Sequence, residues 1–289
     1  MSKVLIATEK PFAAPAVAGI KQILTEAGFE VVLLEKYTTK AELLAAVADV
    51  EAIIIRSDII DAEVFDAAKQ LKIVVRAGAG YDNVDLESAT AHGVCVMNTP
   101  GQNANAVAEL VFAMLLFGVR NRFNGTSGTE LKDKKLGLLA YGNTGRNVAR
   151  IAKGFGMDIY AYDPFTPAEV IEKEGVHAVA SQKELFSTCD IVSLHIPATP
   201  ETKGSIGREL VSLMPKKGIL VNTARKEVIN EPELIALLKE REDLRYFADI
   251  RPGAHEEFEA AAGDRYFSTP KKMGAQTSEA NTNAGLAAA

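Results

Sequence analysis

The chain has few cysteines, no block of basic residues and no long apolar run, and each of these absences argues against a class of protein. Only Cys95 and Cys189 occur in 289 residues, so we expect no disulfide framework and a reducing compartment, the cytoplasm. The formal net charge of −6 without a basic cluster argues against a nucleic-acid partner. No apolar run reaches membrane-spanning length, and the amino-terminal run is too short for a signal peptide. We therefore expect no membrane partner, no metal site and a small molecule as ligand.

The most informative stretch lies between residues 136 and 163. Its apolar runs and glycines predict a strand, a tight turn, a helix and a second strand, which are Leu136–Ala140, Tyr141–Gly145, Arg146–Phe155 and Asp158–Tyr162. This order is a βαβ unit, and the spacing of its glycines suits a dinucleotide.

Three residues of this unit would contact the dinucleotide. Gly142 lets the backbone approach the pyrophosphate, and Gly145 lets the helix pack against the strand. Asp163 lies where a carboxylate accepts hydrogen bonds from the adenosine ribose and repels a 2′-phosphate, so NAD is favoured over NADP. Ala140 replaces the first glycine of the usual pattern, which is acceptable only if its φ stays negative. The alternative is a βα turn in another doubly wound domain.

Strands and helices alternate through the first hundred residues, which indicates a small parallel α/β domain. The strands are predicted at Lys3–Thr8, Phe29–Leu34, Ala52–Ile55, Ile73–Arg76 and Val94–Met97, and the helices at Pro15–Ala27 and Lys40–Val47. Ligands of such sheets bind beyond the carboxyl ends of the strands, which singles out Arg56, Ser57 and the glycine turn that follows Arg76.

A polar loop at 98–105 separates this region from a second run of alternating elements. We predict helices at Ala106–Phe123, Thr202–Leu213 and Glu231–Glu240, strands at Ile191–His195, Ile219–Asn222 and Tyr246–Ile250, an irregular stretch up to Pro270, and a helical tail at Ser278–Ala289. The tail ends abruptly on Gly-Leu-Ala-Ala-Ala, so we expect the natural protein to be longer.

Five ordered motifs resemble the D-2-hydroxyacid dehydrogenases. They are RAGAGYDNVDL, NTPGQNANAVAEL, the glycine turn, VSLHIPATPETKG and VNTAR. The resemblance implies an α/β fold with two Rossmann-like, doubly wound parallel-sheet domains. The NAD domain, residues 98–274, is inserted into a substrate domain made of residues 1–97 and 275–289. It further implies an active-site cleft between the domains and a homodimer formed through the NAD domains.

The resemblance also assigns residues to the substrate. Arg225 would bind the substrate carboxylate, which a planar and permanently charged guanidinium suits. The turn containing Ala77 and Gly78 would present N–H groups to the same carboxylate, and Asn103 would lie in the cleft. Arg56 and Ser57 match the pair that contacts a substrate phosphate in the members acting on 3-phosphoglycerate.

Further positions are assigned to NAD. They are Gly142, Asn143, Thr144 and Gly145 at the pyrophosphate, Asp163 at the ribose, His195, Pro197 and Thr202 at the adenine side, and Thr223, Ala224, Asp249 and Gly274 elsewhere in the cofactor site. Asp249 matches the aspartate that orients the nicotinamide carboxamide. His195 could be taken for a catalytic histidine, but its place in SLHIP favours the cofactor wall.

The proton-transfer site departs from the family pattern. Most members pair a histidine with a glutamate, but Lys271 and Ala254 occupy these two places. A lysine acts as a base only when burial or a neighbouring cation, here Arg225 or Lys272, favours its neutral form. Some family members that lack a regulatory domain carry lysine here. Whether Glu256 or Glu257 replaces the missing glutamate stays open.

These features predict an enzyme that oxidises 3-phosphoglycerate to 3-phosphohydroxypyruvate with NAD, the first step of serine biosynthesis, with Lys271 accepting the hydroxyl proton. One alternative is the reduction of glyoxylate, hydroxypyruvate or another 2-keto acid. Another is an NAD-sensing protein similar to the corepressors related to this family, which the missing histidine and glutamate would suit.

Overall fold

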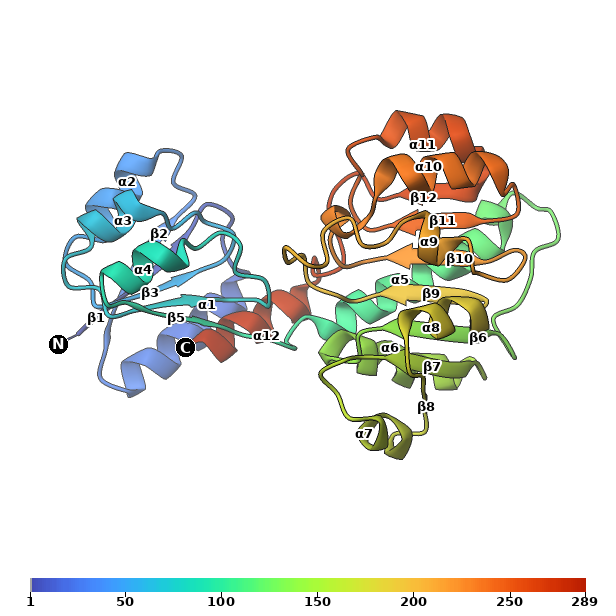
Figure 1. Cartoon of the computed structure of the whole chain (residues 1–289). Coiled ribbons are helices and arrows are strands. Elements are labelled where there is room, and N and C mark those ends of the chain that lie inside the picture. Colours follow the sequence, from blue (N-terminus) through green and yellow to red (C-terminus); the bar gives the residue numbers. More distant parts are fainter. Residues whose placement is uncertain (1) are drawn as a thin grey trace. The chain divides into compact units, whose positions relative to one another are not determined.

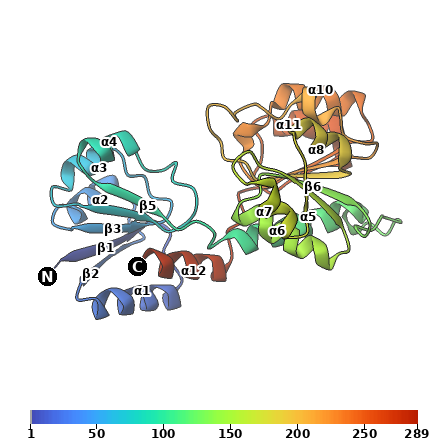
Figure 2. The same cartoon turned by 60° about the horizontal axis from the view of Figure 1, so that its bottom comes forward.

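The computed structural model describes residues 2–289 and divides them into two compact units (Figures 1 and 2). The first unit runs up to Asn103 and includes Gln276–Ala289, and the second is Ala104–Ala275. The loop at 98–103 thus belongs to the first unit, whereas the predicted boundary placed it in the second. The Thr99 N–H donates to the Gly78 carbonyl at 2.9 Å, which fastens the loop to the glycine turn.

The first unit is built on a parallel sheet of five strands in the order β2-β1-β3-β4-β5. The strands are β1 (Lys3–Thr8), β2 (Glu30–Glu35), β3 (Ala52–Ile55), β4 (Ile73–Arg76) and β5 (Cys95–Asn98). The helices are α1 (Ala14–Glu26), α2 (Lys40–Ala46), α3 (Ala62–Ala67), α4 (Leu86–Ala91) and α12 (Ser278–Ala288). All five strands lie within two residues of their predicted bounds.

Helices cover this sheet on both faces. One apolar core joins the sheet to α2, α3 and α4 through side chains such as Leu43, Val64 and Phe65. The other core joins it to α1 and α12, which lie side by side in both views. The carboxyl-terminal helix therefore completes the core of the amino-terminal unit.

The second unit has a parallel sheet of seven strands in the order β12-β11-β10-β9-β6-β7-β8. The strands are β6 (Lys135–Leu139), β7 (Asp158–Tyr162), β8 (His177–Ala178), β9 (Ile191–Leu194), β10 (Ile219–Asn222), β11 (Arg245–Ala248) and β12 (Tyr266–Ser268). The order runs outward in both directions from the β6–β9 pair, which is the doubly wound arrangement.

Two apolar cores cover the faces of this larger sheet. One contains α5 (Ala104–Val119), α6 (Asn143–Gly154) and α7 (Ala168–Lys173), and the other contains α8 (Gln182–Thr188), α9 (Arg208–Val211), α10 (Glu231–Glu240) and α11 (His255–Ala262). Short 3₁₀ turns occur at η1 (Asn121–Phe123), η2 (Lys226–Val228) and η3 (Gly263–Arg265). The chain is thus an α/β protein of two Rossmann-like units.

Two predicted segments were wrong. The helix expected at Thr202–Leu213 shrinks to α9, because Ile206 forms a β-bridge with Ile229 instead of continuing a helix. The stretch expected to be irregular up to Pro270 contains α11 and β12. Among the described residues, no helix has the length and apolar character needed to cross a membrane.

Candidate active site

The glycine turn ends directly in the first turn of α6. Gly142 is the N-cap residue, and the first backbone bond of the helix runs from the Arg146 N–H to the Gly142 carbonyl at 3.0 Å. The helix therefore begins at Asn143, three residues earlier than predicted, and no side chain caps it. Asn143 and Thr144 are its first two residues, where backbone N–H groups have no partner within the helix. This positive helix end is the kind of site that binds a phosphate.

The two glycines are needed for different reasons. A Cβ on Gly145 would lie 2.5 Å from the Ala140 carbonyl oxygen, so the close packing there requires glycine. A Cβ on Gly142 would meet no protein atom within 4 Å, so space remains beside the turn. Ala140 itself has φ of +79°, whereas the sequence prediction required a negative φ. The turn is therefore made with a strained alanine in the place of the usual glycine.

Asp163 accepts hydrogen bonds from the backbone, including one from the glycine turn at 141–145. One carboxylate oxygen accepts the Tyr141 N–H and the other accepts the Phe165 N–H, both at 2.8 Å. Each oxygen keeps an acceptor position for a further donor, such as a ribose hydroxyl. The Tyr141 bond also fixes the residue that follows the strained Ala140, a role that the sequence pattern did not reveal.

Buried polar atoms without a hydrogen-bond partner in the described chain follow two neighbouring strands of the second unit. Both ring nitrogens of His195, after β9, are shielded from solvent and have no hydrogen-bond partner among the described residues. Burial lowers the pKa of His195 from 6.5 to about 4, so the ring is neutral. The Thr223 hydroxyl, after β10, is likewise buried without a partner in the described chain. Such atoms are costly unless a ligand supplies the missing bonds.

Thr202 serves its own loop. Its hydroxyl donates to the Pro197 carbonyl at 2.5 Å and accepts the Thr199 N–H at 2.7 Å. These bonds set the backbone path of the segment after His195.

The segment with Ala224 and Arg225 is held by two side chains, of which the sequence analysis named only Lys272, and for another role. Asn222, at the end of β10, accepts the Ala224 N–H at 3.0 Å and donates to the Arg225 carbonyl at 2.9 Å. The Lys272 ammonium donates to the Ala224 carbonyl at 2.8 Å. The backbone on either side of the Ala224–Arg225 peptide is thus held by side-chain hydrogen bonds.

Asp249 follows β11 and is 1% exposed. One of its oxygens accepts the Thr269 hydroxyl and the Met273 N–H, and the other accepts the Gly274 N–H, all at 2.8 Å. Asp249 therefore fastens the loop that carries Lys271.

The predicted base is not buried. Lys271 is exposed, whereas the sequence analysis named burial as one way in which a lysine can act as a base. Ala254 precedes α11, and its N–H donates to Glu231 at 2.7 Å. Glu256 and Glu257 are exposed on α11.

In the first unit, Arg56 follows β3 and bonds within its own unit. Its guanidinium donates to the Lys10 and Pro11 carbonyls at 2.8 and 2.9 Å, and to the Asn281 side chain at 2.5 Å. Ser57, beside it, is exposed. Three bonds leave part of the five-donor guanidinium for another acceptor.

Asp58 connects the strands at this edge of the sheet. The sequence analysis did not select it, because the Arg56-Ser57 pair matched there ends one residue earlier. The carboxylate is 2% exposed and accepts the Glu9 N–H at 2.7 Å, the Tyr37 hydroxyl at 2.8 Å and the Arg56 N–H at 3.1 Å. Burial and this carboxylate raise the pKa of Tyr37 far above its usual value. One buried acid therefore joins the ends of β1, β2 and β3.

The glycine turn after β4 differs from the prediction at one donor. The Ala77 N–H donates to the Ile55 carbonyl at 2.8 Å, so the sheet uses it and it cannot bind a substrate. Gly78 has φ of +149°, and a Cβ there would overlap the Arg76 guanidinium, so this position requires glycine. Asn103, at the end of the unit, is half-buried.

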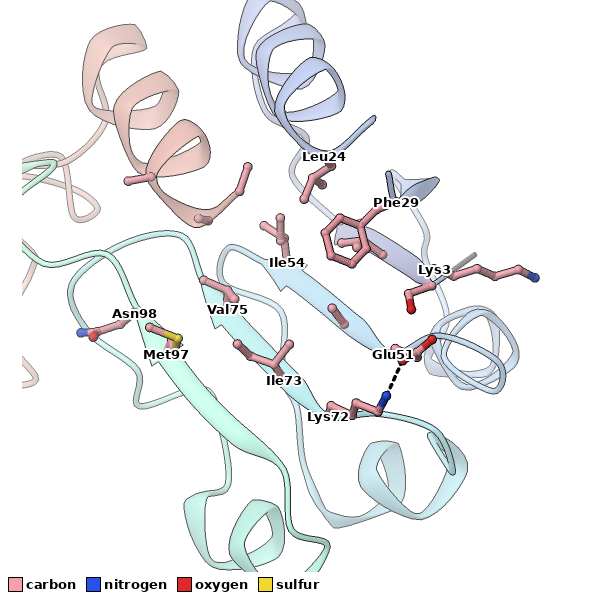
Figure 3. A pocket seen from close by; sticks show the side chains of 16 residues that line it. Lys3, Leu24, Phe29, Glu51, Ile54, Lys72, Ile73, Val75, Met97 and Asn98 are labelled. Atoms are coloured by element: carbon pink, nitrogen blue, oxygen red, sulfur yellow. Dashed lines mark hydrogen bonds and ion pairs between the residues drawn. The ribbon is translucent and has the colours of Figure 1, made fainter. Parts of the chain in front are cut away.

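The first unit also has an apolar hollow of about 440 Å³. Figure 3 shows Ile54, Ile73 and Val75 lining it, with the Lys72–Glu51 ion pair at its rim. The hollow is bordered by the amino-terminal ends of β1, β3 and β4 and by the last two residues of β5, and none of the residues predicted to bind the substrate lines it. It is therefore not the predicted site.

The residues of the second unit fit a dinucleotide. A dinucleotide would place its phosphates at the uncapped start of α6 and fill the space beside Gly142. It would also offer hydrogen-bond partners near the unpartnered nitrogens of His195. Residues 116–263 match the model of the D-isomer specific 2-hydroxyacid dehydrogenase NAD binding domain. The chain belongs to this dehydrogenase family. Its second unit carries the NAD-binding domain, with NAD as the cofactor.

Two curated relatives are identical to this dehydrogenase at more than a third of the aligned positions. D-3-phosphoglycerate dehydrogenase of Methanocaldococcus jannaschii is 38% identical over 86% of this chain and 50% of its own length. Hydroxypyruvate reductase of Thermotoga maritima is 34% identical over 89% of this chain and 88% of its own. The chain thus spans about half the length of the first relative and most of the second.

A solved structure is more similar still. The NAD⁺-bound 3-phosphoglycerate dehydrogenase of Entamoeba histolytica has a TM-score of 0.89 and 48% identity, and the match covers 99% of this chain and 92% of that one.

Proposed function

We propose that this dehydrogenase oxidises 3-phosphoglycerate to 3-phosphohydroxypyruvate with NAD, as the entry step of serine synthesis. The observation that carries the proposal is the similarity to the Entamoeba histolytica enzyme, which at 48% identity extends over 99% of the chain. The carboxylate at Asp163 supports NAD, because it would repel the 2′-phosphate of NADP.

The proposed roles follow the chemistry of each side chain. Gly142, Asn143 and Thr144 would hold the pyrophosphate, Asp163 the ribose, and His195 would line the adenine side. When bound, NAD supplies the hydride acceptor. Thr223, Ala224, Asp249 and Gly274 would border its nicotinamide end.

Each anionic group of the substrate would be held by one arginine together with uncharged polar groups. Arg225 and the N–H groups of the turn at Gly78 would bind the carboxylate, with Asn103 as a further contact. Arg56 and Ser57 would bind the phosphate, using the part of the guanidinium left by its bonds to carbonyls. Lys271 would accept the hydroxyl proton as the hydride leaves.

The test is a substrate panel with purified protein, NAD and NADP. We expect NADH oxidation with phosphohydroxypyruvate and NAD reduction with 3-phosphoglycerate, and neither with the phosphorylated cofactor. Failure of both reactions with NAD would overturn the proposal. The second candidate is hydroxypyruvate reduction, which the Thermotoga maritima relative favours because the match covers 88% of that protein. A preference for hydroxypyruvate over its phosphorylated form would establish it.

We also propose a homodimer formed through the second unit, and the cytoplasm as its location. The location is supported by Cys95 and Cys189, which are both free. Size-exclusion chromatography with light scattering would test the dimer by measuring the molar mass in solution. The mass of a single chain at micromolar protein concentration would contradict the proposal.

A further inference from the structure

The hydroxyl of Thr269 connects the segment that follows β12 to the segment that follows the neighbouring strand β11. It donates to Asp249 Oδ1 at 2.8 Å and accepts the Ile250 N–H at 2.8 Å. The Thr269 N–H also donates to the Ala248 carbonyl at 3.0 Å, which continues the pairing of the two strands. Thr269 is 4% exposed, so water does not compete for these bonds.

The backbone beside this hydroxyl is strained. Ile250 has φ of +108°, which a β-branched residue rarely adopts. Such conformations persist only where the surroundings enforce them, and they gather at functional sites. The bond from the Ile250 N–H to Thr269 is the contact that holds this conformation next to Asp249.

The same hydroxyl decides which carboxylate oxygen of Asp249 stays available. Oδ1 accepts two protein donors, the Thr269 hydroxyl and the Met273 N–H, which fill both of its acceptor positions. Oδ2 accepts only the Gly274 N–H and keeps one position for a further donor. Thr269 therefore sets the orientation of the Asp249 carboxylate.

We propose that Thr269 is a positioning residue for hydride and proton transfer. It fixes the Asp249 carboxylate so that Oδ2 can accept the nicotinamide carboxamide, and it fixes the start of the loop that carries Lys271 two residues later. This inference rests on the proposed dehydrogenase reaction. In the described chain the Thr269 hydroxyl bonds to Asp249 and Ile250 only, so it acts through these two residues.

The decisive variants are Thr269→Val, which keeps the shape but loses both hydroxyl bonds, and Thr269→Ser, which keeps them. Binding of NAD and of ADP-ribose, which lacks the nicotinamide, is measured by calorimetry. We expect Thr269→Val to weaken NAD binding about tenfold and to leave ADP-ribose binding unchanged, because only the nicotinamide end depends on Asp249. Thr269→Ser restores NAD binding.

Turnover gives a second readout. We expect kcat of Thr269→Val to fall about 10- to 100-fold with the KM of the keto acid little changed, because a misplaced loop impairs the reacting geometry. Equal loss of NAD and ADP-ribose binding would overturn the inference, since Thr269 would then only support the fold. Unchanged NAD binding would overturn it as well. A wild-type protein that binds NAD but reduces no keto acid would instead contradict the proposed function.

Discussion

The Arg56 guanidinium donates to the Asn281 side chain at 2.5 Å, so the residue assigned to the substrate phosphate is tied to α12. Arg56 also bonds the carbonyls of Lys10 and Pro11. Its replacement therefore affects the fold as well as any phosphate contact, and the two effects must be separated.

We predict that Arg56→Met lowers the ratio of kcat/KM for phosphohydroxypyruvate over hydroxypyruvate about 100-fold, since a charged hydrogen bond to a phosphate contributes roughly 1.5–3 kcal/mol. Asn281→Ala is the matched control, because it removes one bond of Arg56 but keeps its charge. Steady-state kinetics with both substrates measures the ratio. An unchanged ratio in Arg56→Met would remove Arg56 from the phosphate site.

Ala140→Gly should stabilise the protein. Ala140 has φ of +79°, which costs an L-residue roughly 1–2 kcal/mol and glycine much less. We expect the free energy of unfolding to rise by about 1 kcal/mol, seen as a higher urea midpoint with an unchanged slope. A lower midpoint would show that the alanine methyl group contributes packing that outweighs the strain.

Gly142→Ala should mainly weaken NAD binding, whereas Gly145→Ala should mainly lower the stability of the fold. The Gly145 variant places a Cβ 2.5 Å from the Ala140 carbonyl, so we expect a loss of stability. The Gly142 variant meets no protein atom, so we expect only the small loss of stability that alanine causes at an N-cap, while NAD binding weakens about tenfold or more where the pyrophosphate approaches. Thermal unfolding and calorimetry distinguish them, and normal NAD binding by Gly142→Ala would contradict the assigned pyrophosphate position.

Lys271→Met should lower kcat about 10²- to 10⁴-fold with little change in KM, as expected for loss of a proton acceptor. Lys272→Met is the matched control, because it replaces the adjacent lysine in the same way. It loses the bond to the Ala224 carbonyl, which helps to fix Arg225, so we expect mainly a higher KM for the keto acid. If the two variants exchanged these effects, Lys272 would be the proton acceptor.

The shielded ring nitrogens of His195 predict a pH dependence of stability. Burial lowers its folded pKa from 6.5 to about 4, so between these values the unfolded chain binds a proton that the folded chain does not. Stability therefore falls by up to about 3 kcal/mol as the pH drops from 6.5 to 4, and His195→Gln lacks this contribution. Urea unfolding of both proteins across this range tests it, and parallel curves would contradict it.

Local sequence patterns predicted most of the strands and the position of the glycine turn, because these depend on short apolar runs and on glycine spacing, but they missed the short strands β8 and β12. They missed contacts between distant residues, such as Asp58 with Tyr37 or Thr269 with Asp249, since no local pattern encodes them. The helix expected from Thr202 failed for a related reason. Its apolar spacing suits a helix, but Ile206 pairs with Ile229, which is distant in sequence.

The packing of α12 against α1 has a consequence for synthesis on the ribosome. Leu286 and Gly285 of α12 lie against Gly19, Phe12 and Ile20, so this face of the first unit stays bare while the nascent chain is extended through the whole second unit. The core of the first unit is thus closed only after the second unit has been synthesised, and until then its apolar surface is exposed in the nascent chain.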